Sequence, residues 1–245
     1  MNDQQPGQGG AKLGLPLLCL AYLAVGVGLG AVWWQFSETR VVNAFHKLYY
    51  RHASRTLHNT YWLGVPTRKC PLDMWVYGEI LYETRPDVIV ETGTYKGGSA
   101  YFFASMFDLM DQGRVLTIDI ADQPDKPKHK RISYLLGSST SDSVFQAVKN
   151  SVKESEKVMV VLDSDHTKAH VLNELRLYSA LVTVGSYLVV EDTDLNGHPV
   201  SPEHGPGPAE ALEEFLETNS DFVRDASREK FGLTFFPGGW LKRIR

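Results

Sequence analysis

Short apolar runs alternate with longer helical patterns between residues 72 and 190 of this 245-residue chain. Runs typical of buried strands lie at Val88 to Val90, Val115 to Ile118, Ile132 to Leu136, Val158 to Leu162 and Tyr187 to Val190. Helical spacing is found over Leu72 to Glu83, Ala100 to Met110, Ser141 to Ser151 and Ala169 to Leu181. This alternation predicts an α/β fold with a doubly wound, mostly parallel sheet.

The carboxyl-terminal part follows a different pattern. A further helix is expected over Ala209 to Thr218, after the rigid loop Gly205 to Pro208. Gly232 to Phe236 and Trp240 to Ile244 then flank a Pro-Gly-Gly turn, which predicts a closing antiparallel hairpin.

The amino-terminal part divides into three segments. Residues 1–12 are polar and rich in Gly and Gln, which predicts disorder. Residues 13–34 carry no charge and end in Trp33-Trp34, which predicts one transmembrane anchor. A cleaved signal peptide is the alternative, disfavoured by the bulky indoles where small residues would be needed. A G-x-x-x-G pattern at residues 26–30 offers a face for a homo-oligomer.

Residues 35–60 have the spacing of a juxtamembrane amphipathic helix with a basic face. Its cations are Arg40, Lys47, Arg51 and Arg55, whereas only Lys12 precedes the apolar segment. The positive-inside rule then places the following domain, residues 61–245, on the cytoplasmic side of a plasma or inner membrane. The helix either lies on anionic lipid or packs on the domain.

Charge and cysteine content exclude some classes of protein. The formal net charge is −4, which gives no case for nucleic acid as a partner. Cys19 and Cys70 are the two cysteines, too few for a disulfide framework or a zinc site.

A glycine-rich turn follows the first predicted strand, in the stretch from Glu91 to Ser99. Its Glu-x-Gly-x-x-x-Gly-Gly spacing lacks the G-x-G of dinucleotide sites and suits S-adenosylmethionine, whose ammonium needs a carboxylate. The alternative is a sheet-edge turn without a ligand. The cofactor-binding residues predicted here are Glu91, Gly93, Thr94, Lys96, Gly97 and Ser99.

The ends of the next two strands extend this cofactor site. Asp119 follows Glu91 by about 28 residues, where doubly wound folds place an acid on the ribose hydroxyls. Ser138 and Ser139, after the third strand, are predicted to flank the adenine. The alternative for Asp119 is an ordinary strand-end carboxylate.

A second cluster follows the last two parallel strands. Asp163, Glu191 and Asp192 offer hard oxygen ligands at one edge of the sheet, which predicts Mg²⁺. The metal would lower the pKa of a substrate hydroxyl, and His166 would take its proton, with Asp163 as the other catalytic residue. Alternatively, these acids face water or cap helices, and His166 only bonds at a helix start.

Together these motifs resemble the cephalosporin hydroxylase / rhamnosyl O-methyltransferase family. The resemblance rests on Glu91 to Ser99, Leu162 to His166, Val190 to Asp192 and the stretch after Gly205. It implies a Rossmann-like class I methyltransferase fold, S-adenosylmethionine as cofactor, and Mg²⁺ at Asp163, Glu191 and Asp192. His166 stands where plant and catechol O-methyltransferases carry a Lys, which leaves the base open.

The sequence therefore predicts a membrane-anchored, Mg²⁺-assisted O-methyltransferase. Its acceptor would be a hydroxyl of a sugar, a glycolipid or a small natural product, with lipid biosynthesis as one setting. The alternatives are a non-catalytic membrane adaptor and a nucleotide-cofactor oxidoreductase, the latter disfavoured because no G-x-G turn follows the first strand.

Overall fold

The computed structural model describes residues 38–245, of which residues 38–51 are helical. The compact unit begins at Phe45 and ends at Arg245. The predicted disordered segment (1–12), the predicted anchor (13–34) and the start of the predicted amphipathic helix (35–37) lie outside the described residues. Within residues 38–245, no helix is both long enough and apolar enough to cross a bilayer.

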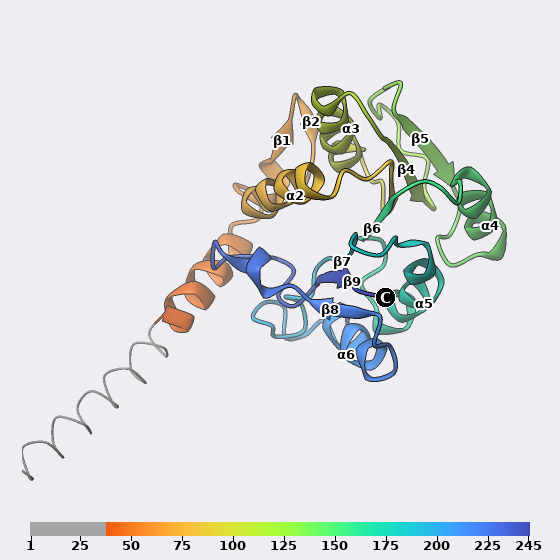
Figure 1. Cartoon of the computed structure of the whole chain (residues 1–245). Helices are drawn as coiled ribbons and strands as arrows, with labels where there is room; N and C mark the ends of the chain where they lie inside the picture. Colours follow the sequence, from red (N-terminus) through yellow and green to blue (C-terminus); the bar gives the residue numbers. More distant parts are fainter. Residues whose placement is uncertain (1–37) are drawn as a thin grey trace, which may run out of the picture. The chain divides into compact units, whose positions relative to one another are not determined.

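A seven-stranded sheet forms the centre of the compact unit (Figure 1), with the strand order β5-β4-β3-β6-β7-β9-β8. The strands are β3 (Val88–Thr92), β4 (Arg114–Asp119), β5 (Ile132–Leu136), β6 (Val158–Leu162), β7 (Tyr187–Val190), β8 (Phe222–Arg224) and β9 (Trp240–Arg243). β3 to β7 are mutually parallel, and β9 pairs antiparallel with both β7 and β8. The predicted mostly parallel sheet is confirmed.

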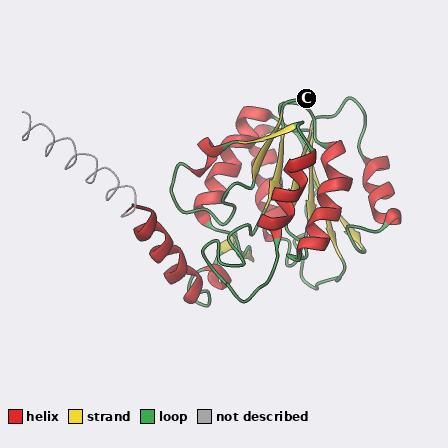
Figure 2. Ribbon diagram, turned by 90° about the horizontal axis from the view of Figure 1, so that it is seen from below, coloured by secondary structure: helices red, strands yellow, loops and turns green. Residues whose placement is uncertain are grey.

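Helices cover both faces of this sheet (Figure 2). The α-helices of the domain are α2 (Pro71–Thr84), α3 (Gly98–Met110), α4 (Asp142–Ser151), α5 (Lys168–Tyr178) and α6 (Pro208–Thr218). Short 3₁₀ turns are η1 (Leu57–Asn59), η2 (Ser179–Leu181) and η3 (Ala226–Glu229), and β1 (Tyr61–Trp62) pairs with β2 (Val65–Pro66) as a separate ribbon.

Alternating strand residues divide the apolar core into two layers. Ile89, Met159 and Val189 pack with α2 and α3 on one face. Val90 and Val160 pack with α4, α5 and α6 on the other face. Burial of each such side chain contributes about 1.5–3 kcal/mol, so the inner strands hold their register firmly.

The predicted antiparallel ending of the sheet is confirmed, but its first strand is wrong: β9 pairs with β8 (residues 222–224) and not with residues 232–236. The segment between the two strands, residues 225–239, contains η3, a buried loop and the turn at residues 237–238. Leu233 to Phe236 are all buried, so they lack the alternation of a half-exposed strand. Phe235 donates its N–H to Asp73 and Phe236 donates to the Thr234 hydroxyl, so side chains replace a partner strand.

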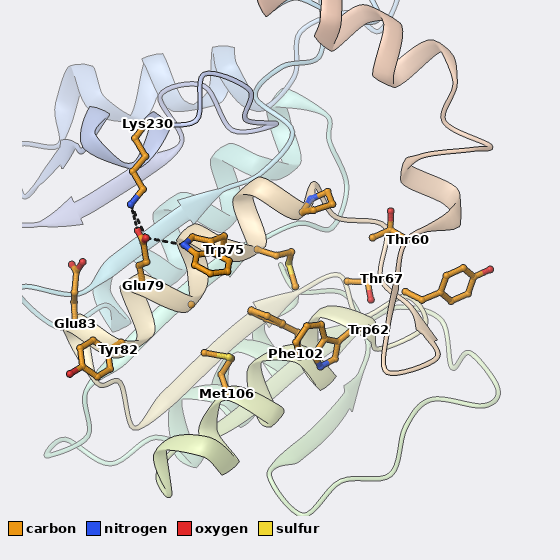
Figure 3. A pocket seen from close by; sticks show the side chains of 14 residues that line it. Thr60, Trp62, Thr67, Trp75, Glu79, Tyr82, Glu83, Phe102, Met106 and Lys230 are labelled. Carbon is orange, nitrogen blue, oxygen red and sulfur yellow. Dashed lines mark hydrogen bonds and ion pairs between the residues drawn. The ribbon is translucent and has the colours of Figure 1, made fainter.

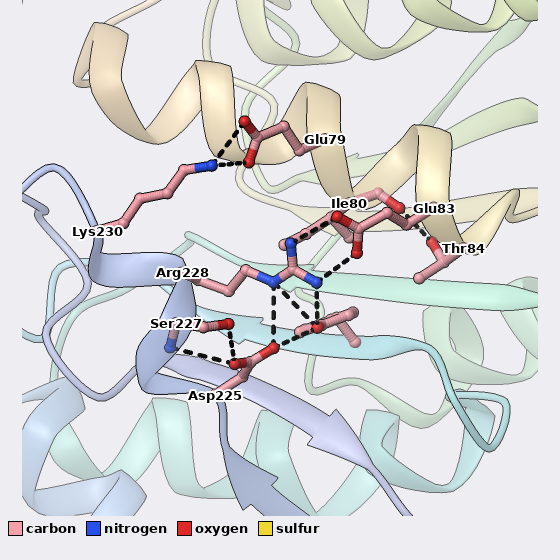
Figure 4. A network of polar contacts seen from close by, with 9 residues as sticks. Glu79, Ile80, Glu83, Thr84, Asp225, Ser227, Arg228 and Lys230 are labelled. Atoms are coloured by element: carbon pink, nitrogen blue, oxygen red, sulfur yellow. Dashed lines mark hydrogen bonds and ion pairs between the residues drawn. The ribbon is translucent and has the colours of Figure 1, made fainter.

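A polar network fastens α2 to the segment around η3 (Figure 4). Arg228 contacts Glu83 and Asp225, and Lys230 contacts Glu79 through both carboxylate oxygens. Glu83 and Lys230 are exposed to solvent, so their pairs contribute about 1 kcal/mol or less each. Their main effect is to fix the position of α2 along one side of an apolar groove described below.

Candidate active site

A cavity of about 390 Å³ lies at the carboxyl ends of β3, β4, β6 and β7. Ligands of open α/β sheets bind at this edge. Its lining includes Gly93, Thr94, Tyr95, Ser99, Asp119, Asp163, His166 and Asp192 from the sheet edge, and Tyr50, Leu57, His58, Arg68 and Lys69 from the segments before α2. We call it the catalytic pocket.

Two glycines of the predicted cofactor motif are required by packing within the protein. A Cβ on Gly93, whose φ is +89°, would lie 1.8 Å from the carbonyl oxygen of Asp163. A Cβ on Gly98 would lie 2.3 Å from the carbonyl oxygen of Pro66. The turn after β3 is therefore pressed against β6 on one side and against the β2 segment on the other.

Glu91 is completely buried at the end of β3 and is absent from the pocket lining. Thr117 donates its hydroxyl to Oε2 at 2.6 Å, and Oε1 has no hydrogen-bond partner among the described residues. Burial raises the pKa of the Glu91 carboxyl to about 7, and the Lys69 charge opposes this shift. Ser99, whose hydroxyl also opposes the rise in the pKa of Glu91, lines the pocket, so Glu91 lies behind that wall.

Asp119 lines the pocket from the end of β4, as the prediction requires. Its Oδ2 accepts the N–H of Tyr95 at 2.7 Å and its Oδ1 accepts the N–H of Ala121 at 2.9 Å. Asp119 therefore ties the glycine turn to β4 while one side remains open to the pocket.

The other predicted cofactor residues fall into two groups. Thr94 lines the pocket and shares a hydrogen bond with Thr117 at 2.7 Å. Lys96, Gly97, Ser138 and Ser139 are absent from the lining. Ser139 instead bonds to His170 at 3.0 Å and accepts the Tyr178 hydroxyl on its carbonyl, so it is engaged in the domain interior.

Asp163, His166 and Asp192 converge on the catalytic pocket. One potential ligand atom from each lies within 4.8 Å of the others, and His166 Nε2 is 3.2 Å from Asp192 Oδ2. The three side chains are half-buried, so they face both the protein and the pocket. Two carboxylates with open access to a cavity fit Mg²⁺, which keeps several waters and takes few protein ligands.

Glu191, the remaining predicted metal ligand, lies behind this group. It is 3% exposed, Tyr77 donates its hydroxyl to Oε1 at 2.7 Å, and the Lys69 ammonium contacts Oε2. Lys69 also contacts Asp163 Oδ2. Burial, reinforced by the charge of Asp163, raises the pKa of Glu191 well above its ordinary value.

Lys69 and Tyr77 have no signal in the sequence. Lys69 lies in an irregular segment, and its partners are 94 and 122 residues away along the chain. Tyr77 occupies an ordinary apolar position of α2. Only the fold brings them to the acids.

Tyr50 belongs to residues 45–59, the segment through which the compact unit begins, and this segment forms one wall of the catalytic pocket. His46 holds the segment in place: its Nε2 is 2.8 Å from Asp194 Oδ2, and its ring stacks on Phe235. Asp194 follows Asp192 by two residues, so this bond also braces the loop that carries the acid cluster.

A second, apolar groove of about 820 Å³ lies between α2 and α3 (Figure 3). Its lining includes the side chains of Trp62, Met74, Trp75, Tyr82, Phe102 and Met106. Glu79 and Lys230 pair at its rim. Thr67 lines both the groove and the catalytic pocket, so the two cavities lie on either side of that residue.

Comparisons with known proteins agree with this architecture. The family model described as Rhamnosyl O-methyltransferase/CmcI matches residues 54–244. A Rhamnosyl O-methyltransferase of Mycobacterium tuberculosis is 40% identical over 210 residues, covering 83% of this chain and 85% of the relative. The Mycobacterium leprae protein of the same name is 39% identical over 209 residues, covering 83% of this chain and 90% of the relative.

Solved structures show the same fold. A structure of CmcI described with Mg and SAM has a TM-score of 0.61 and 22% identity, covering 77% of this chain and 78% of that chain. A CmcI apo structure has a TM-score of 0.60, with 22% identity and 77% of each chain covered.

The sheet order and the likeness to these solved structures define a Rossmann-like α/β fold with polar groups at its carboxyl edge. The match over residues 54–244 and the 40% identity are more specific. The chain belongs to the Rhamnosyl O-methyltransferase/CmcI family. This membership confirms the resemblance noted in the sequence and the predicted enzyme class, an S-adenosylmethionine-dependent O-methyltransferase.

Proposed function

We propose that the enzyme transfers the methyl group of S-adenosylmethionine, with help from Mg²⁺, to a hydroxyl of a sugar or a sugar-containing lipid. The observation that carries this proposal is the convergence of Asp163, His166 and Asp192 beside the glycine turn. The relatives named Rhamnosyl O-methyltransferase support a sugar acceptor.

In this proposal the cofactor lies over the turn after β3. Asp119 accepts hydrogen bonds from the ribose hydroxyls, while Thr94 and Ser99 form the wall beside the methionine part. Glu91 lies behind that wall, bonded to Thr117, and would present its carboxyl on the side of the cofactor ammonium. Gly93 permits the close approach of the turn to Asp163.

Asp163 and Asp192 would hold the metal, with Glu191 behind them. When bound, Mg²⁺ lowers the pKa of the acceptor hydroxyl and orients its oxygen. His166 would accept the hydroxyl proton on its imidazole ring, and Asp192, whose Oδ2 lies 3.2 Å from Nε2, would stabilise the imidazolium that forms. S-adenosylmethionine would supply the methyl group to the acceptor oxygen and would leave as S-adenosylhomocysteine.

The apolar groove supports an acceptor with a hydrophobic part. In this proposal the sugar lies in the catalytic pocket and the hydrophobic part of the acceptor lies in the groove on the other side of Thr67, where aromatic side chains would cover an alkyl or aryl group. We also propose that residues 13–34 anchor the enzyme in a membrane where such acceptors reside. Release of the full-length protein from membranes by high salt alone would contradict the anchor.

Calorimetric titration of S-adenosylhomocysteine, with and without Mg²⁺, tests the proposal. We expect binding to the wild-type protein that Asp119→Ala weakens by about tenfold, the value of one good hydrogen-bonding carboxylate. The absence of binding by folded protein in both conditions would contradict the proposal and favour the adaptor.

A further inference from the structure

The Lys69 ammonium is the closest cation to the acid cluster, and it is almost completely buried. The residue is 4% exposed, and its Nζ contacts Asp163 and Glu191 from the side of the domain interior. An ammonium has three N–H donors and no acceptor, so it binds carboxylates but not a metal. It therefore occupies one side of the cluster permanently.

The charges around Lys69 leave room for one further cation. Asp163, Glu191 and Asp192 carry at most three negative charges, and the Lys69 ammonium, in contact with Asp163 and Glu191, offsets one of them. The remaining two charges match one divalent ion. A second divalent ion near Glu191 would meet the ammonium in a region of low dielectric, where like charges repel strongly.

The contacts of Glu191 agree with this count. Both of its oxygens already have partners within the domain, the Tyr77 hydroxyl on Oε1 and the Lys69 ammonium on Oε2. By contrast, Asp192 lies on the pocket side beside His166. Asp163 lies between the two groups, because it contacts Lys69 and is also close to His166 and Asp192.

We propose that Lys69 is a positioning residue and a built-in cation, which holds Asp163 and Glu191 in place before metal binds and restricts the site to a single divalent ion on the pocket side. The proposal rests on the proposed function, because it concerns the same metal site. It assigns to Lys69 a role in metal binding in addition to its contribution to packing.

Replacement of Lys69 by the apolar Met tests this role. Removal of a neighbouring positive charge strengthens the attraction of the carboxylates for a cation, so K69M should bind Mg²⁺ at least about tenfold more tightly in calorimetry. The melting temperature of K69M should also rise more on Mg²⁺ addition than that of the wild type, because the metal replaces the lost ammonium.

Two matched variants separate charge from packing. Lys69→Arg keeps the positive charge and should retain the wild-type affinity for Mg²⁺. Tyr77→Phe removes a hydrogen bond from Glu191 without changing any charge, so it should alter the Mg²⁺ affinity less than about threefold. If K69M does not fold, Lys69→Gln serves as the neutral variant in the same titration.

The outcomes distinguish this inference from the proposed function. If the wild type binds Mg²⁺ and the neutral variant binds it equally or more weakly, Lys69 does not set the metal site and the inference is overturned. If the neutral variant binds Mg²⁺ and the wild type does not, Lys69 excludes the ion instead of leaving room for one, so the inference and Mg²⁺ assistance both fail. If neither protein binds Mg²⁺, both fail.

Discussion

His46 Nε2 lies 2.8 Å from Asp194 Oδ2, and both side chains are almost completely buried. Asp194 Oδ1 has no hydrogen-bond partner among the described residues. The hydrogen bond between His46 and Oδ2 is therefore the main contact that offsets the burial of this carboxylate. His46→Ala should lower the free energy of unfolding by about 3 kcal/mol, because the buried Asp194 carboxylate loses its hydrogen-bond partner.

A double-mutant cycle with Asp194→Ala measures the pair itself, using denaturant unfolding of the full chain. We expect the double variant to be more stable than the sum of the two single losses implies, because it leaves no buried carboxylate without a partner. Strict additivity would show that the two residues act independently.

Gly93→Ala should destabilise the domain by about 3 kcal/mol or more, because the added Cβ would meet the Asp163 carbonyl at 1.8 Å. Gly185 is the matched control: its φ is +84°, and nothing lies within 4 Å of the corresponding Cβ. Gly185→Ala should cost only the conformational penalty, about 1–2 kcal/mol. Equal losses in thermal unfolding would remove the steric explanation.

Asp73 gives the stability of the domain a pH dependence. Burial raises the pKa of its carboxyl to about 7, although the Phe235 N–H opposes this shift. Between about pH 4 and pH 7 the folded protein therefore binds more protons at Asp73 than the unfolded chain does, and the unfolding free energy decreases as pH rises.

Asp73→Asn removes this contribution. The stability difference between wild type and variant should change with a slope approaching about 1.4 kcal/mol per pH unit in that range and level off above pH 7. Unfolding curves from pH 4 to pH 8 provide the measurement. Parallel pH profiles for the two proteins would show that Asp73 is ionised in the fold.

Asp163→Asn should reduce methyl transfer by about a hundredfold or more, because the acid cluster loses a ligand charge and Lys69 loses a partner. The affinity for S-adenosylhomocysteine should stay within a few-fold of wild type. Asp221→Asn, at an exposed position beside β8, is the control and should leave turnover unchanged. Wild-type turnover by the Asp163 variant would refute the metal site.

Gly78→Leu should fill part of the apolar groove, since a Cβ at this position already lies 3.6 Å from Met106. We expect about a tenfold rise in KM for acceptors with a long alkyl chain and little change for the bare sugar. Gly78→Ala adds a single methyl group and should leave both values near wild type. An equal rise in KM for both acceptors would show that the groove does not bind the alkyl chain.

The inner strands were predictable because both faces of each strand are buried. Residues 158–162 and 187–190 form inner strands with the predicted bounds, since continuous apolar runs of that length suit a covered parallel sheet. Residues 132–136 also form a strand with the predicted bounds, although it lies at the sheet edge and is only half-buried. The last strands were not predictable in the same way. Phe222 to Arg224 is short and half-exposed, whereas the apolar run 233–236 is buried as a loop.

The candidate site was predictable only where it follows strand ends. Asp119, Asp163 and Asp192 line the pocket because each follows a parallel strand. Lys69, Tyr77 and the His46–Asp194 pair depend on contacts between distant segments, which leave no periodicity in the sequence. Serines 138 and 139 follow a strand as well, but the third strand is at the sheet edge, outside the pocket.

The pocket wall formed by residues 45–59 limits how the enzyme can be engineered. A shortened version that starts at the first strand pair would retain every sheet residue and still lose Tyr50, Leu57 and His58 from the pocket. Fusions, truncations and chimaeras should therefore join new sequence before Phe45. A catalytic domain that is moved into another protein therefore needs residues 45–59 to keep this wall of the pocket.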